Sequence, residues 1–146
     1  MTAMRPLMSI PMVMCRLDLD EDDVLILIED RALAWAFDIA GRGARRRTIR
    51  VLTENVEDLE QSRKQPFADD EKEWRRVSGL IFPARSTIAT CELARSLSCS
   101  RANAIRLIHQ DHFRLAEGAR IRRGPYGSPQ IVTASAKEWL RKRRML

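Results

Sequence analysis

Residues 87–110, TIATCELARSLSCSRANAIRLIHQ, constrain the fold more than any other segment of this 146-residue chain. Thr90 is suited to cap a first helix, and Ser100 is suited to cap a second one. The inward positions predicted from helical spacing are Leu93, Ala94 and Leu97 in the first helix and Ala104, Leu107 and Ile108 in the second. Only a tight turn at Ser98 and Cys99 separates the two. The segment therefore predicts a pair of short helices that cross at this turn.

This helix pair resembles the DNA-binding helix-turn-helix, whose first helix needs a small residue where the second helix crosses it. Ala94 occupies that position. The residues that fall on the apolar, small and capping positions of the motif without a gap are Leu93, Ala94, Leu97, Cys99, Ser100, Ala104 and Leu107. Ser98 stands where the motif commonly has glycine, because the backbone of that turn residue tends to be left-handed.

The resemblance makes the second helix a recognition helix. Its predicted outward residues are Arg101, Ala102, Asn103 and Arg106, with Ser100 at the end that approaches phosphate. Arginine can make two hydrogen bonds to guanine, asparagine can do the same with adenine, and alanine allows close approach to a thymine methyl group. The alternative is an ordinary solvated helix face, since helix pairs with this spacing also occur in proteins that bind no DNA.

Positive charge is concentrated in the same part of the chain. Residues 1–80 hold 13 Lys and Arg against 16 Asp and Glu, whereas residues 81–146 hold 13 against 4. The net charges are −3 and +9, which give the +6 of the whole chain. A small basic unit is suited to a polyanion, because each neutralised phosphate releases condensed counterions. Charge alone leaves an anionic membrane surface or an acidic protein as rivals to nucleic acid.

Two further elements are predicted after the helix pair. Residues 119–133, ARIRRGPYGSPQIVT, are two β-prone runs around a Gly/Pro turn, which predicts a hairpin with a basic wing. The arginines on one arm of that wing are Arg120, Arg122 and Arg123. Ser135 and Glu138 predict a capping box for a final helix. Trp139 and Leu140 are expected to close the core, and the arginines and lysine at 141–144 suit phosphate contact.

The order of helix, turn, helix, wing and capped helix over about residues 81–144 resembles the winged helix-turn-helix of phage excisionases and the related MerR-type DNA-binding domains. The resemblance covers roughly the last 45% of the chain. It implies that residues 101–106 enter the major groove. It also implies that the wing, from Arg120 to Tyr126, contacts an adjacent minor groove or the backbone.

The N-terminal part is predicted to form a helix, a β-hairpin and a second helix. The acidic run at 18–23 offers Asp20, Asp22 or Asp23 as the cap of a helix around 21–31. Strands are expected near 34–39 and 48–52, and a second helix is expected from Asn55. An arginine cluster lies between and beside these strands: Arg42, Arg45, Arg46, Arg47 and Arg50. It is either a second wing that contacts DNA or a solvated loop.

The expected fold class is α+β, with an N-terminal module at 1–65, a helical linker at 66–80 and a winged helix-turn-helix at 81–146. Within the linker, residues 69–77 are predicted as a helix that Gly79 and Pro83 stop. Residues 105–115 parallel 25–35, and residues 131–140 parallel 49–59. The N-terminal module is thus either a divergent second winged unit or similar by chance. The Met-rich leader before residue 16 is left open between a flexible arm and an edge strand.

Other chemistries are less favoured by the pattern. A zinc site of Cys91, Cys99, His109 and His112 lacks a standard spacing, and the histidines are expected near phosphate instead. The three cysteines are expected to be free and buried. No nucleophile elbow, P-loop, zincin or dinucleotide motif is present, so we expect neither an enzyme nor a cofactor. With no candidate membrane span or secretory signal, we expect a cytoplasmic protein.

The sequence therefore predicts a protein that binds duplex DNA in a sequence-specific manner. It would act as a transcriptional regulator or as an excisionase-like accessory factor in recombination, with a homodimer or a cooperative multimer on DNA left open. The alternative is a protein-interaction adaptor that binds a partner through residues 1–80 and has weak nonspecific affinity for nucleic acid. RNA is less favoured, because aromatic residues make up only 5% of the chain and suggest no base-stacking platform.

Overall fold

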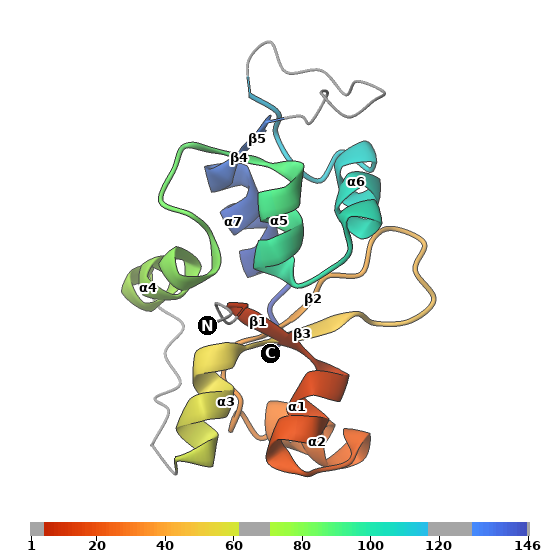
Figure 1. The fold of residues 1–146 in the computed structure, drawn as a ribbon, viewed down its shortest axis with the longest axis vertical. Helices are drawn as coiled ribbons and strands as arrows, with labels where there is room; N and C mark the ends of the chain where they lie inside the picture. The colour runs from red at the N-terminus through yellow and green to blue at the C-terminus, as the bar shows by residue number, and fades with distance from the viewer. Residues whose placement is uncertain (1–4, 62–70, 117–129, 146) are drawn as a thin grey trace.

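The computed structural model describes residues 5–61, 71–116 and 130–145 and shows an α+β fold, as expected (Figure 1). The first half contains β1 (Leu7–Ser9), α1 (Ile10–Leu17), α2 (Glu21–Glu29), β2 (Ala36–Asp38), β3 (Ile49–Leu52) and α3 (Thr53–Glu60). The second half contains α4 (Glu71–Ile81), β4 (Thr87–Ala89), α5 (Thr90–Leu97), α6 (Arg101–His109), β5 (Gln130–Val132) and α7 (Thr133–Lys142). The predicted hairpin of the first half is confirmed as β2 and β3.

Two small antiparallel sheets organise these elements. The first has the order β1-β3-β2, with Leu7 opposite Leu52 and Ala36 opposite Val51, and the second pairs β4 with β5. Along β3 the side chains alternate between the two faces of the sheet. Val51 packs against α1, α2 and α3, while Leu52 joins the core shared with the second half.

The two halves repeat the same backbone plan with an offset of 80 residues. In each, a short strand leads into two helices joined by a left-handed residue, Asp18 (φ 55°) or Ser98 (φ 52°). The caps of α2 and α6 are equivalent, because the side chains of Asp20 and Ser100 each accept a hydrogen bond from the backbone three residues later. The weak sequence repeat is therefore present in the fold.

The start of the third helix in each repeat is fixed by an equivalent backbone contact. The amide of Thr53 donates to the carbonyl of Pro6 at 2.9 Å, and the amide of Thr133 donates to that of Ser86 at 3.0 Å. These contacts correct the sequence alignment, which placed 131–140 against 49–59, since Thr133 corresponds to Thr53. The leader, which was left open, supplies β1 and α1 of the first repeat.

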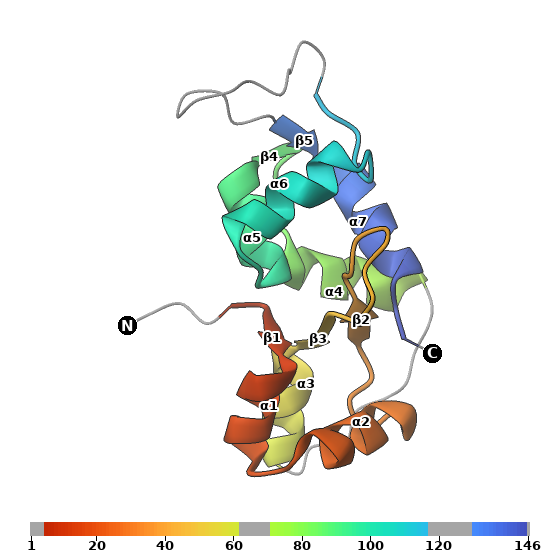
Figure 2. The ribbon, with the colours of Figure 1, turned by 90° about the vertical axis from the view of Figure 1, so that its right-hand side faces the viewer.

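One hydrophobic core extends across both halves. The rings of Trp35 and Trp74 have centroids 5.6 Å apart, and Phe37 lies 6.1 Å from each of them. The same cluster includes Leu107 and Leu140 from the second half. In both views α4, which carries Trp74, lies at the level between the two halves (Figures 1 and 2). The described part of the segment expected to be a linker, from residue 71 onward, thus contributes Trp74 and Val77 to the core.

The end of the chain joins the halves a second time. Residues 143–145 run beside β2, where the amide of Asp38 donates to the carbonyl of Arg143 and the amide of Met145 donates to that of Ala36. The guanidinium group of Arg144 lies 3.5 Å above the ring of Trp35 and donates to the carbonyl of Ala34. A cation held over an indole face in this way stabilises the contact between the halves.

The predicted capping box of the last helix is wrong. Helix α7 begins at Thr133, and the residue before it, Val132, ends β5. The hydroxyl group of Ser135 donates to the carbonyl of Val132 at 2.7 Å and accepts from the amide of Arg114 at 2.9 Å. The strand therefore runs straight into the helix, and Ser135 ties the helix to the chain after α6. Trp139 and Leu140 are buried, as expected.

Two other helix ends differ from the prediction. Thr90 is the first residue of α5 and not its cap; the carboxylate of Glu92 accepts from the amide of Ala89 instead, at 3.1 Å. Helix α4 continues through Gly79 to Ile81. Burial of Ile81 against the shared core offsets the cost of a glycine inside the helix. The helix ends just before Pro83, because the residue that precedes a proline disfavours the helical conformation.

Candidate nucleic-acid interface

The helix pair at 90–109 has the predicted geometry. Ser98 adopts the left-handed conformation, and the Ser100 hydroxyl accepts from the amide of Asn103 at 3.1 Å, which caps α6. The residues predicted to face inward are all buried: Leu93, Ala94, Leu97, Ala104, Leu107 and Ile108. Ala94 lets the two helices approach closely. The buried residues Ala104, Leu107 and Ile108 anchor α6, so the opposite face of this helix is exposed to solvent.

Ser98→Gly is expected to raise the free energy of unfolding by up to about 1 kcal/mol. Glycine removes the steric cost of a left-handed residue, about 1–2 kcal/mol. It also increases the conformational entropy of the unfolded chain, which offsets part of this gain in stability. Urea denaturation measures the change, with Asp18→Gly at the equivalent turn as a matched comparison. A decrease in stability would mean that the Ser98 side chain contributes more than its backbone conformation costs.

The outward face of α6 is basic and has an apolar centre. Arg101, Ala102 and Arg106 are exposed, and Asn103 is half-buried. Ile105 is 37% exposed between the two arginines. The structure therefore brings the predicted recognition residues together on one face. The sequence reasoning passed over Ile105, although its spacing from Arg101 places both on that face.

The arginine loop between β2 and β3 lies beside the end of α6 (Figure 2). The amide of Arg42 donates to the side-chain oxygen of Gln110 at 2.9 Å, and the side-chain nitrogen of Gln110 donates back to the carbonyl of Arg42 at 3.3 Å. Gly41 permits this approach, because a Cβ atom there would lie 2.5 Å from the Gln110 oxygen. Arg45 and Arg46 of this loop are exposed.

Arg50 does not belong with the exposed arginines. Its Nε atom donates to the carbonyls of Leu97 and Ser98, at 3.2 and 3.0 Å. Burial lowers the pKa of this guanidinium group from its usual value, with a smaller contribution from the charge of Arg5. From the first half of the chain, Arg50 thus supplies hydrogen bonds to the turn between α5 and α6. Arg50 therefore differs from both alternatives left open for the arginine cluster, since it lies in β3 and is half-buried.

The cations at 141–144 are also not all free for phosphate. Arg144 stacks on Trp35, Arg141 pairs with Glu71, and the guanidinium group of Arg143 lies 5.4 Å from the Trp139 ring. Long-range contacts of this kind cannot be read from a basic run. The predicted wing residues, Arg120, Arg122, Arg123 and Tyr126, lie outside the described residues.

Helix α2 occupies the place of α6 in the first repeat but has the opposite charge. Its outward residues are Glu21, Asp22, Leu25, Ile26 and Glu29, where α6 has Arg101, Ala102, Ile105, Arg106 and His109. Carboxylates and phosphates repel each other, so this face is not suited to DNA. The first repeat therefore keeps the backbone plan of the second without its chemistry.

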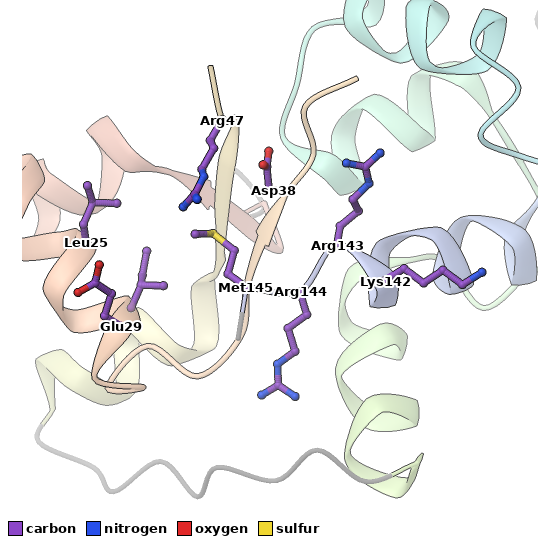
Figure 3. Close-up of a pocket in the computed structure, with 9 residues that line it drawn as sticks. Leu25, Glu29, Asp38, Arg47, Lys142, Arg143, Arg144 and Met145 are labelled. Carbon is purple, nitrogen blue, oxygen red and sulfur yellow. The ribbon is translucent and has the colours of Figure 1, made fainter. Parts of the chain in front are cut away.

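A pocket of about 560 Å³ lies between α2, the base of the arginine loop and residues 142–145 (Figure 3). Leu25, Ile28 and Met145 give it an apolar part. The side chain of Arg47 extends toward Met145, whereas Lys142 and Arg144 point away (Figure 3). Arg47 therefore lines this pocket, whereas Arg45 and Arg46 of the same loop do not.

Two of the three cysteines have other environments than expected. Cys99 is buried, but Cys15 and Cys91 are exposed, which corrects the prediction that all three thiols are buried. An odd cysteine count argues against a disulfide framework and does not determine burial. The ring nitrogen Nε2 of His112 lies 3.1 Å from the Gln110 side-chain oxygen, and burial lowers the pKa of this imidazole.

Within the described ranges, no group of three or more His, Cys, Asp or Glu side chains is placed to hold a metal ion. Likewise, no helix in the part of the chain that the structure describes is long and apolar enough to cross a membrane. Comparisons with protein-family models, curated proteins and solved structures found no match to this chain.

Proposed function

We propose that the chain binds duplex DNA in a sequence-specific manner through a winged helix-turn-helix in its second half, with α6 as the recognition helix. One observation carries the proposal: a basic face on a capped helix lies next to an arginine loop that Gln110 holds in place. The two basic groups come from parts of the chain about 60 residues apart. Their juxtaposition supplies both base-reading and phosphate-binding side chains.

The two groups would do different work. Arg101, Arg106 and Asn103 on α6 have the hydrogen-bonding groups that discriminate base pairs in the major groove. Arg45 and Arg46 would contact the backbone beside that groove, and a backbone contact supplies affinity without sequence information. Bound in this way, the protein would act by occupancy and not by chemistry, in the cytoplasm.

Such occupancy suits a transcriptional regulator or an accessory factor in recombination, as in the excisionases that residues 81–144 resemble. The adaptor function is a second candidate, and the acidic face of α2 favours it for the first half of the chain. The two candidates are compatible, since α2 and α6 belong to different repeats.

The double change Arg45→Ala and Arg46→Ala tests the phosphate-binding role. We expect weaker binding to every duplex and a log–log salt dependence flatter by about 0.9 for each phosphate that the variant no longer neutralises. Arg47→Ala, in the same loop but directed to the pocket, serves as the matched control and should change the slope less. Fluorescence anisotropy of labelled duplexes over a salt series measures both the affinity and the slope of its salt dependence. An unchanged slope in the double variant would remove the loop from the interface.

A further inference from the structure

The outward face of α2 is exposed around Ile26, and its end at Glu29 borders the pocket that Arg47 and residues 142–145 also line. Ile26 on this face is 50% exposed. Acidic residues surround it: Glu21, Asp22 and Glu29 are all exposed. None of these three carboxylates has a salt bridge to another described residue. The face thus combines an apolar centre with an acidic rim.

The outward face of α6 is its complement. Ile105 is 37% exposed at the centre, and Arg101 and Arg106 flank it. Because α2 and α6 are equivalent helices of the two repeats, the faces have a similar length, although Ile26 stands at the position of Arg106 and Ile105 at the position of Leu25. An isolated isoleucine on a surface needs no partner, but two centred on faces of opposite charge are suited to each other.

We propose that these faces bind each other between two copies of the chain, with α2 of one copy against α6 of the next. The contact is head-to-tail, because the two faces differ, and each copy retains one free face for a further contact. Ile26 and Ile105 would form its apolar centre, and the carboxylates would pair with the arginines at its rim. This inference does not depend on DNA binding, although it involves α6, the helix that we propose to contact the DNA bases.

Two consequences follow. Duplex DNA and α2 of a second copy compete for Arg101 and Arg106, so free protein would associate and DNA would dissociate it. The contact also depends on salt. Whole copies carry a net charge of +6 and repel each other, so association at low ionic strength requires a directed contact and not general attraction.

A charge-swap experiment without DNA tests the contact. The first variant makes α2 basic (Asp22→Arg with Glu29→Arg), and the second makes α6 acidic (Arg101→Glu with Arg106→Glu). A control with the same charge change as the second variant reverses two exposed cations of α4 (Lys72→Glu with Arg75→Glu). Sedimentation equilibrium measures the average mass at about 0.01 M salt, where the screening length is roughly 30 Å, and again at 1 M.

We expect the natural chain and the α4 control to associate at low salt and to become monomeric at 1 M. Each swapped variant alone should remain monomeric, because its two faces then carry the same charge. An equal mixture should associate again, because both faces of the first variant are basic and both faces of the second are acidic. Ile26→Ser should weaken association of the natural chain by about tenfold, and Leu80→Ser, at an exposed leucine of α4, should not. Circular dichroism establishes that every variant is folded.

A natural chain that stays monomeric at low salt would overturn the proposal, as would a mixture that fails to restore association. Association that survives both swaps would place the contact elsewhere on the molecule. Since no DNA is present, failure here leaves the proposed function standing. Conversely, the proposed function fails on its own if duplex DNA does not bind.

Discussion

Trp74→Ala is expected to lower the free energy of unfolding by about 3–5 kcal/mol. Trp74 is 6% exposed and packs on Trp35 and Phe37 of the first half, in the cluster that includes Leu107 and Leu140 of the second. Removing the ring leaves a cavity where the two halves meet. Urea denaturation followed by circular dichroism measures the change, and Leu80→Ala, at a 47% exposed leucine of the same helix, is the matched control.

The location of the destabilisation matters as much as its size. Because the halves share this core, hydrogen exchange should speed up in both β3 and α5 of the variant. Faster exchange confined to one half, or two separate unfolding transitions in the natural chain, would show that the repeats fold independently. That outcome would favour the domain boundary expected near residue 81.

Arg101→Ala and Arg106→Ala are each expected to weaken binding to the preferred duplex by about 1–3 kcal/mol and to change binding to scrambled DNA less. Both side chains are exposed on the outward face of α6, and a contact with two hydrogen bonds to one base carries sequence information. Arg75→Ala, at an exposed arginine of α4, is the matched control, because α4 and α6 lie on opposite sides of the molecule (Figure 1). Equal weakening on both duplexes would mean that the arginines contact phosphate only.

The parts of the fold that depend on local signals could be predicted from the sequence. Ser100 and Asp20 cap their helices as expected, and the inward residues of α6 are those given by helical spacing. Helix α1 begins in the leader, which the sequence left open between a flexible arm and an edge strand, and Pro11 lies at its start. A proline in the first two positions of a helix is tolerated, since the amide there has no intrahelical partner in any case.

What the sequence could not show are contacts between distant segments. Nothing in an arginine cluster distinguishes Arg50, which donates to the turn before α6, from Arg45, which is exposed. Similarly, Ser135 has the spacing of a capping residue, but the pairing of β4 with β5 places the start of α7 three residues earlier, with Val132 at the cap position. Tertiary contacts determine both the environment of Arg50 and the start of α7. They also bring the arginine loop close to α6.

Selection of bound fragments from a random duplex library by the full chain tests the central claim most directly. The proposed function predicts enrichment of a defined sequence motif and tighter binding of that motif than of its scrambled form. Replacement of Arg101 or Arg106 should change the preferred bases. Recovery of fragments with no shared motif, or equal affinity for the motif and its scrambled form, would contradict sequence-specific recognition by α6.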